Sequence, residues 1–238
     1  MSRVNLEFYR MDSLPKHIED IAKEIADHFK VRRPYIPQFC SLIKTSKRWN
    51  LSNLEVKLGQ WETFFSRTQG TRGIIDIVKR GFNSCKNDIE IDKLRGAMVE
   101  ALVIGAHGGS IVLSDRYKYG WGSRVDLLLK GGKVQLIYNC KHHKYPDCSR
   151  RSTVDFGYWN GQHGQFFECK AQPAGIGCKE VSYMQNLKSE LSNRGISNEI
   201  FFVCAEHRDA VKIRLEDFGL SPVYKPWGIE DIQISISA

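Results

Sequence analysis

The chain has 238 residues, 42% of them hydrophobic and 26% charged, which is ordinary for a globular protein with a substantial core. Its formal net charge of +8 at pH 7 suits an anionic partner, most often nucleic acid. No apolar run is long enough to span a membrane, and residues 1–10 lack the apolar segment of a signal peptide. The seven cysteines have no framework spacing, which argues against an oxidised exterior. We therefore expect a cytoplasmic protein with no membrane partner.

The first ninety residues predict a mainly helical region. Apolar side chains recur at helical spacing over residues 18–29, 54–65 and 72–82. Pro34 and Pro37 are expected to interrupt helical structure after the first of these helices. We therefore divide the chain into an N-terminal helical region that contacts DNA or a second copy of the chain, and a core that follows it.

The same region is rich in basic and aromatic side chains. Twelve Lys or Arg and three acids lie between Lys30 and Lys86, together with two tryptophans. Cations that follow phosphates and rings that stack on bases are typical of nucleic-acid binding, with Lys47 and Arg48 as candidate contacts. The alternative is a solvated basic face whose aromatic side chains belong to the core.

Residues 91–106 predict a helix that is almost wholly apolar in its C-terminal half and ends at the glycines that follow. Glu100 lies in that apolar half. A carboxylate in such a place is costly unless it is paired or faces a polar cavity. Glu100 therefore either reaches solvent at the margin of the helix or points into a functional site, and we favour the second interpretation.

A hairpin follows, with strands predicted over 124–130 and 133–140 around Gly131 and Gly132. That turn would place Asp126, a possible additional acid, opposite Ile137.

The next loop is strongly basic. Its candidate nucleic-acid contacts are Lys141, His142, His143, Lys144, Arg150 and Arg151. The loop also contains a possible structural Zn²⁺ site that lacks a Cys-x-x-Cys pair, formed by Cys140, His142, His143 and Cys148.

A second hairpin carries the residues of greatest interest. Asn160-Gly161 separates two runs rich in aromatic and β-branched residues, which is a strong signal for a tight turn. The antiparallel register then places Asp155 opposite Glu168, and alternation along the strand returns Lys170 to the same face. Two carboxylates and an amine are therefore expected on one patch of a sheet.

Two neighbouring carboxylates repel unless a cation lies between them. Mg²⁺ binds one or two carboxylates and leaves its other positions to water and phosphate, while a lysine beside it can orient the water. The alternative is a surface hairpin that carries a salt bridge.

The remaining chain completes the sheet. Helical spacing predicts a helix over 179–193, and residues 199–205 read as a buried strand. A strand, a helix and a strand in succession imply a crossover that adds a parallel strand. Residues 229–236 are expected to form an edge strand.

This order of elements and the Glu168-Cys169-Lys170 tripeptide resemble the PD-(D/E)xK, or restriction-endonuclease-like, nuclease superfamily, over about Asp92 to Ala205. The resemblance implies that Asp155 and Glu168 are metal-binding acids and that Lys170 is the catalytic lysine. It matches Glu100 to the helix acid that many members direct toward a metal or water, and Gln172 to an auxiliary contact. Val154 stands where many members have proline.

The resemblance implies an α/β fold: a restriction-endonuclease-like core at residues 91–238, with a mixed sheet flanked by helices, after the helical region at residues 1–90. It implies a Mg²⁺-dependent DNA endonuclease, with Mn²⁺ as a substitute, in a restriction or anti-phage defence system. A homodimer and a partner protein of that system are expected. The alternatives are a non-catalytic DNA-binding or assembly subunit with the same fold, and a junction-resolving or repair nuclease.

Overall fold

The computed structural model describes residues 5–31, 34–129, 131–138, 152–220 and 222–235. Its centre is one mixed sheet with the strand order β1-β2-β4-β5-β6-β7, and β3 pairs with β2 beside this path. The strands are β1 (Asn5–Arg10), β2 (Tyr119–Leu129), β3 (Gly132–Gln135), β4 (Val154–Trp159), β5 (His163–Lys170), β6 (Ser197–Cys204) and β7 (Tyr224–Trp227). Pairs from β1 to β5 are antiparallel, whereas β6 and β7 add in parallel.

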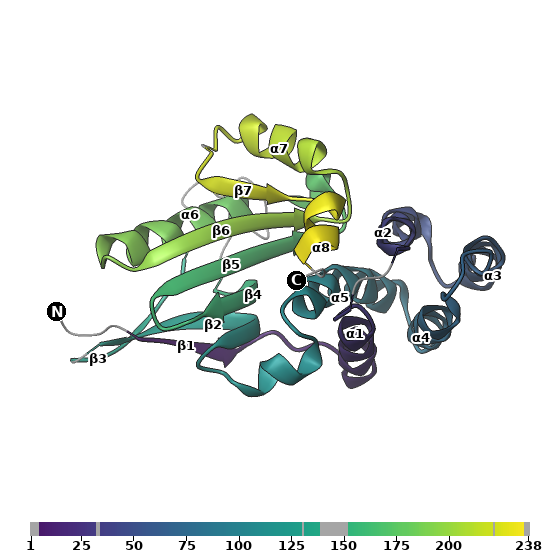
Figure 1. Ribbon diagram of the computed structural model, residues 1–238, viewed down its shortest axis with the longest axis horizontal. Coiled ribbons are helices and arrows are strands. Elements are labelled where there is room, and N and C mark those ends of the chain that lie inside the picture. Colours follow the sequence, from purple (N-terminus) through teal and green to yellow (C-terminus); the bar gives the residue numbers. More distant parts are fainter. Residues whose placement is uncertain (1–4, 32–33, 130, 139–151, 221, 236–238) are drawn as a thin grey trace.

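Helices cover both faces of the sheet. The α-helices are α1 (Lys16–His28), α2 (Ile36–Thr45), α3 (Leu54–Phe65), α4 (Arg72–Asn83), α5 (Asp88–Ala106), α6 (Cys178–Asn193), α7 (Arg208–Asp217) and α8 (Ile229–Ser235). Figure 1 shows α1 to α4 gathered to one side, with α5 between them and the strands. Buried side chains of α1 to α5 and α8 share one hydrophobic cluster, while α6 and α7 contribute to a second. The fold is therefore a mixed α/β fold with a central sheet flanked by helices.

The predicted helices of the first ninety residues form where their apolar spacing placed them. α1 buries Ile18, Ile21, Ala22, Ile25 and Ala26 on one face. This face packs on α5 so closely that a Cβ added at Gly105 would lie 3.0 Å from the carbonyl oxygen of Ala26. Within the parts of the chain that the structure describes, no helix is both long and apolar enough to cross a lipid bilayer.

The N-terminal region is not purely helical, because β1 belongs to the central sheet. Every residue of β1 pairs with β2, and Leu6 and Phe8 are buried. Phe8 lies over the glycines of the two neighbouring strands, since a Cβ would come within 2.5 Å of its ring at Gly120 and within 2.3 Å at Gly157. In the sequence, the helices α1 to α5 thus lie between β1 and β2, two strands that are neighbours in the sheet. A domain boundary after residue 90 stays a prediction.

The prediction that Pro37 interrupts helical structure was wrong, because Pro37 lies in the first turn of α2. Proline is tolerated there, since the first amides of a helix have no partner within the helix. α2 buries Ile36, Phe39, Cys40, Leu42 and Ile43 in the same cluster as α5.

The first predicted hairpin forms with a different register. Asp126 pairs with Gln135 instead of Ile137, because Leu129 already pairs with Gly132. β2 is eleven residues long, and its first half pairs with β4 while its second half pairs with β3.

The C-terminal edge strand was predicted in the wrong place. The edge strand is β7, whose Pro226 is acceptable there because an edge position needs fewer backbone donors. Residues 229–235 instead form α8, with Ile229 and Ile232 buried at helical spacing. Acidic side chains in its first turn accept backbone hydrogen bonds, Asp231 from the Gly228 N–H (2.9 Å) and Glu230 from the Arg208 N–H (3.1 Å).

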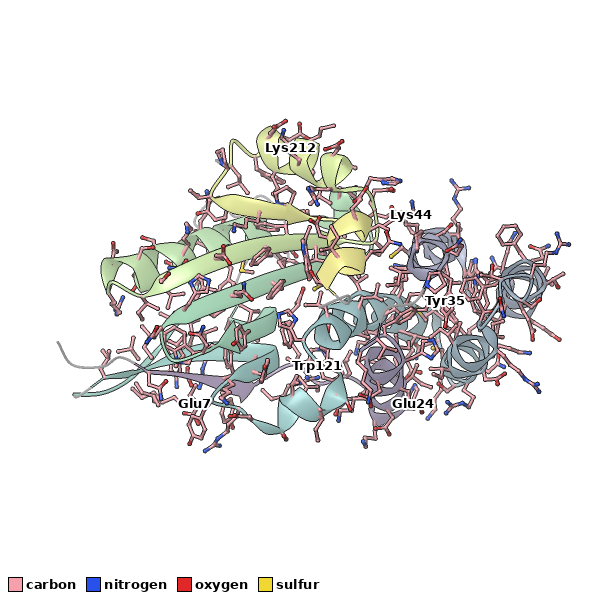
Figure 2. The ribbon with its side chains drawn as sticks, in the orientation of Figure 1. Glu7, Glu24, Tyr35, Lys44, Trp121 and Lys212 are labelled. Carbon is pink, nitrogen blue, oxygen red and sulfur yellow. The ribbon has the colours of Figure 1, made fainter. Side chains whose placement is uncertain are left out.

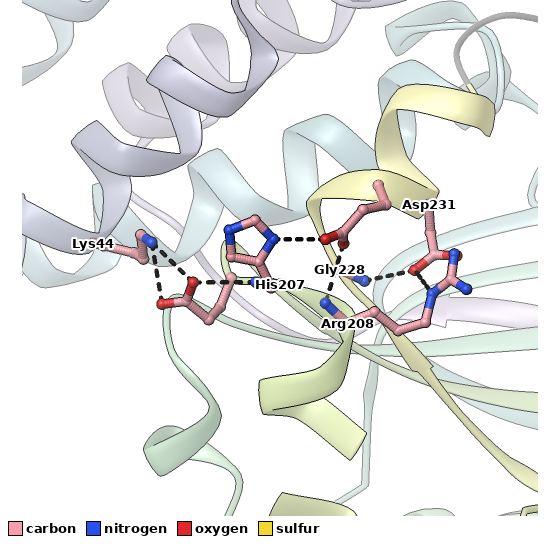
Figure 3. Close-up of polar contacts among 7 residues, drawn as sticks. Lys44, His207, Arg208, Gly228 and Asp231 are labelled. Atoms are coloured by element: carbon pink, nitrogen blue, oxygen red, sulfur yellow. Dashed lines mark hydrogen bonds and ion pairs between the residues drawn. The ribbon is translucent and has the colours of Figure 1, made fainter. Parts of the chain in front are cut away.

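These acids belong to a polar cluster that connects three parts of the fold (Figure 3). Lys44 of α2 donates to both carboxylate oxygens of Glu206 at 2.9 and 3.1 Å, just beyond the end of β6. His207 then forms a hydrogen bond with Glu230 of α8 (2.6 Å), and Arg208 forms an ion pair with Asp231. The cluster fixes α2 and α8 to the same end of the sheet.

Glu199 should make the stability of the sheet depend on pH. It accepts hydrogen bonds from Gln165 (3.0 Å) and His163 (3.2 Å) on β5 and from Lys225 on β7. Burial raises its pKa, but these hydrogen bonds, led by that from Lys225, outweigh it and lower the pKa to about 2. The stabilisation is therefore present above the unfolded pKa near 4.5 and is lost as the pH falls toward 2.

We expect Glu199→Gln to flatten the fall in unfolding free energy between pH 4.5 and pH 2, as measured by urea denaturation at a series of pH values. Glu216→Gln on α7, where the glutamate side chain is 60% exposed, is the matched control and should keep the slope of the wild type. Identical pH profiles for Glu199→Gln and wild type would contradict the assignment.

Candidate active site

The second predicted hairpin has the expected register. Gly161 has a φ of 91°, which favours glycine, and Asn160 Oδ1 accepts hydrogen bonds from the N–H groups of Gln162 (3.0 Å) and His163 (2.8 Å). Phe156 pairs with Phe167, and each following pair keeps the same sum of residue numbers. The prediction of register is confirmed, and it aligns Asp155 with Glu168.

Lys170 is the centre of the cluster that results. Its Nζ donates to Glu168 Oε1 at 2.6 Å and lies 3.5 Å from Glu180 Oε1 and 4.0 Å from Asp155 Oδ2. Glu168 is fully buried and Glu180 nearly so, whereas the Lys170 side chain is 23% exposed. One amine with limited access to solvent is thus held among three carboxyl groups.

Asp155 is positioned by the backbone of the neighbouring strand. Its Oδ2 accepts a hydrogen bond of 2.7 Å from the Cys169 N–H. Asp155 is only 8% exposed. Water therefore competes weakly for the hydrogen bond that joins its carboxylate to the neighbouring strand.

Glu100 of α5 lies close enough to this cluster for the charges of Asp155 and Lys170 to affect its pKa. The indole N–H of Trp121 donates to Glu100 Oε2, and Trp121 lies where β2 approaches α1 (Figure 2). Burial, followed by the charge of Asp155, raises the pKa of Glu100 to about 8, while Trp121, Lys170 and Arg10 act in the opposite direction. Arg10 stacks on Trp121, with its guanidinium carbon 4.1 Å from the ring centroid.

Glu180 was missed by the sequence analysis. It lies in the first turn of α6, where its Oε2 accepts a hydrogen bond of 3.1 Å from the Gly177 N–H while Oε1 faces Lys170. A glutamate three residues after a helix start is a known capping position, so a sequence signal exists. That signal places Glu180 on α6 but does not indicate that α6 begins beside Lys170.

The donor set suits a magnesium ion that keeps much of its water. Across the described ranges, no three His, Cys, Asp or Glu side chains come close enough to hold an ion by themselves. Magnesium, however, is commonly held by one or two carboxylates with water and phosphate at the remaining positions. Burial is the main cause of the raised pKa of Glu100, and the smaller part that comes from the charge of Asp155 is a repulsion that a divalent cation would offset. Asp155 and Glu168 are therefore the two carboxylates that could hold such an ion, with water at its other positions.

Gln172 lies two residues beyond Lys170 but turns toward α2. Its Nε2 donates to the Lys44 carbonyl oxygen and its Oε1 accepts from Lys47 Nζ, both at 3.4 Å. Lys47 and Arg48 form the short 3-10 helix η1 (Ser46–Arg48) that follows α2. The structure thus brings Gln172 to the predicted basic contacts and does not bring it to Asp155.

Asp126 is fully buried and binds two cations of its own hairpin. Arg124 donates to it at 2.7 and 3.0 Å, and Lys133 Nζ lies 2.7 Å from its Oδ2. Burial raises its pKa, but the hydrogen bonds from Arg124 and Lys133 dominate and hold the pKa below its usual value. Asp126 therefore has a structural role within the hairpin.

The remaining predicted contacts, Lys141, His142, His143, Lys144, Arg150 and Arg151, lie outside the described residues, as does the possible zinc site that includes Cys140 and Cys148.

No protein-family model matches the sequence, and no curated protein does either. Among solved structures, the crystal structure of protein VC1899 from Vibrio cholerae is similar over 98% of this chain, with 13% sequence identity and a TM-score of 0.43. The chain spans 57% of that protein's length. This distant likeness carries no argument about function, which therefore rests on the residues described above.

Proposed function

We propose that this protein is a metal-dependent nuclease that hydrolyses phosphodiester bonds of DNA, and that its core is of the PD-(D/E)xK type. The observation that carries the proposal is the placement of Lys170 2.6 Å from Glu168 and 4.0 Å from Asp155 on a hairpin of predicted register. An amine beside paired acids on adjacent strands is an arrangement that can support phosphodiester hydrolysis with a magnesium ion.

Each side chain has a distinct role in the proposal. When bound, Mg²⁺ supplies charge neutralisation at the phosphate and favours ionisation of a nearby water. Asp155 and Glu168 would hold the ion, Lys170 would orient the attacking water, and Glu100, when ionised, would add a further negative charge nearby. Glu180 and Glu168 together fix the position of the Lys170 amine.

The direct test is cleavage of supercoiled plasmid with Mg²⁺, Mn²⁺ or EDTA. Wild type is expected to nick or linearise the plasmid with either metal, and EDTA or Asp155→Asn is expected to abolish cleavage. Asp126→Asn is the matched control, because Asp126 is a buried strand aspartate bound to Arg124 and Lys133, and this variant should still cut if it folds. Metal-independent cutting, or cutting by Asp155→Asn at the wild-type rate, would refute the proposal.

A non-catalytic nucleic-acid-binding subunit is the second candidate. It is favoured by the ion pairs that engage Lys170 with its neighbouring carboxylates, since a purely structural cluster would have the same pairs. Such a subunit should bind DNA without cutting plasmid, single-stranded or branched substrates under any metal condition. Cleavage of branched DNA in preference to linear duplex would instead indicate the junction-resolving or repair class.

A further inference from the structure

A cleft opens between α2 and α3, next to the candidate active site. It has a volume of about 920 Å³ and reaches Gln172, two residues beyond Lys170. Its walls come from α2, η1 and α3, and the ion pair between Lys44 and Glu206 joins α2 to the end of β6 (Figure 3). The cleft is therefore held in a fixed position relative to the strand that carries Lys170.

The charge of the cleft has one sign. Lys44, Lys47, Arg48 and Lys57 line it, and no Asp or Glu does so within the described part of the chain. Glu206 balances Lys44. Lys47, Arg48 and Lys57 are exposed, so they present positive charge to a ligand in the cleft.

The second property of the cleft is its aromatic wall. Phe64 is 66% exposed, although most phenylalanines in this fold are buried. Trp61 stacks on Phe65, with ring centroids 4.9 Å apart and an angle of 25° between the planes, and Phe65 anchors that stack in the core. The cleft thus offers ring faces beside cations, an arrangement that binds a base and its phosphate together.

We infer that this cleft binds unpaired nucleotides of a nucleic-acid strand and leads that strand to Lys170; the inference rests on the proposed nuclease function. Unpaired bases are favoured because a continuous duplex hides its base faces within the stack, whereas an exposed Phe64 can stack only on a base that is open. The volume is within the range of pockets for small ligands, which corresponds to about one or two nucleotides. The substrate would then carry a single-stranded end, flap or branch.

Binding measured in EDTA tests this inference apart from cleavage. The probes are fluorescein-labelled dT12, rU12 and a 12-base-pair duplex, followed by fluorescence anisotropy. We expect wild type to bind the single strands more tightly than the duplex, and the two strands separate DNA from RNA as the source of the unpaired bases. Phe64→Leu should weaken single-strand binding by about 5- to 100-fold, because leucine keeps apolar area but cannot stack. Phe64→Tyr should retain it.

The cations have a separate signature. The double variant Lys47→Ala with Arg48→Ala should lower the slope of log affinity against log salt by about 0.7 for each phosphate that the protein no longer neutralises. Lys212→Ala on α7, where the side chain is 62% exposed, is the control and should leave the slope unchanged.

Equal affinity for duplex and single strands, or unchanged binding by Phe64→Leu, would overturn the inference even if the protein cuts plasmid. Binding of an acidic peptide that Phe64→Leu abolishes, without binding of dT12 or rU12, would also overturn it and assign the cleft to a protein partner. If the predicted binding pattern holds but no substrate is cut, the nuclease proposal fails and the cleft remains a strand-binding site.

Discussion

Replacement of Lys170 by methionine is expected to slow the proposed phosphodiester hydrolysis by about 10²- to 10⁴-fold while DNA binding changes little. Methionine preserves most of the volume of the side chain and removes the amine that lies 2.6 Å from Glu168. The rate should be measured by quenched-flow or timed gel assays at saturating metal, and binding by anisotropy in EDTA. Lys212→Met, at an exposed position on α7, is the control and should cut at the wild-type rate.

Lys170→Met should also cost stability, because it leaves the buried Glu168 without the cation nearest to it. We expect a loss of about 2–3 kcal/mol in unfolding free energy, since Lys170 is only partly buried. Adding Glu168→Gln should restore part of the stability and none of the activity. If the double variant regained activity together with stability, Lys170 would have to be reassigned from catalysis to structure.

Gly228→Ala is expected to be among the most destabilising small substitutions in the fold. A Cβ at this position would lie 2.3 Å from the Arg208 backbone nitrogen and 2.7 Å from the Glu206 carbonyl oxygen. Both neighbours are backbone atoms, so the clash cannot be relieved by rotating a side chain. The loss should be about 2–3 kcal/mol or more in urea denaturation.

Gly96→Ala provides the matched comparison, because nothing lies within 4 Å of a Cβ there and Gly96 is inside α5. It should stabilise the protein by about 0.5–1 kcal/mol, since alanine loses less backbone entropy in a helix. Gly228→Ala should also weaken dT12 binding, because the 206–208 segment that it displaces anchors Lys44. A Gly228→Ala variant as stable as wild type would show that α8 can shift without cost.

The local parts of this fold could be predicted from the sequence. The register of the second hairpin followed from Asn160-Gly161, because a two-residue turn of this kind fixes which residues oppose each other. α3 and α4 followed from apolar residues at helical spacing. In each case the deciding interactions lie within about a dozen residues of one another.

The errors arose where distant parts of the chain decide the outcome. Ile232 and Ile234 alternate as in a strand, but the Ile229 N–H donates to the Glu206 carbonyl oxygen (3.0 Å) and Glu230 accepts from the Arg208 N–H, and these distant contacts belong to the start of a helix. α7 buries only Val211 and Leu215, so its apolar pattern is too weak to stand out. Glu180 reaches Lys170 only because α6 begins beside β5, which is a property of the tertiary fold.

The pairing of β1 with β2 imposes an order on the folding of the chain during its synthesis. β1 ends at Arg10, yet its partners begin at Ser123, and α1 to α5 are made in the interval. At typical translation rates of about 5–20 residues per second, Leu6 and Phe8 remain without their strand for on the order of 10 s. The helices can meanwhile assemble through local contacts, and closure of so long a loop makes the sheet the slower part to form. A nascent chain would therefore acquire α1 to α5 well before β1 joins the sheet.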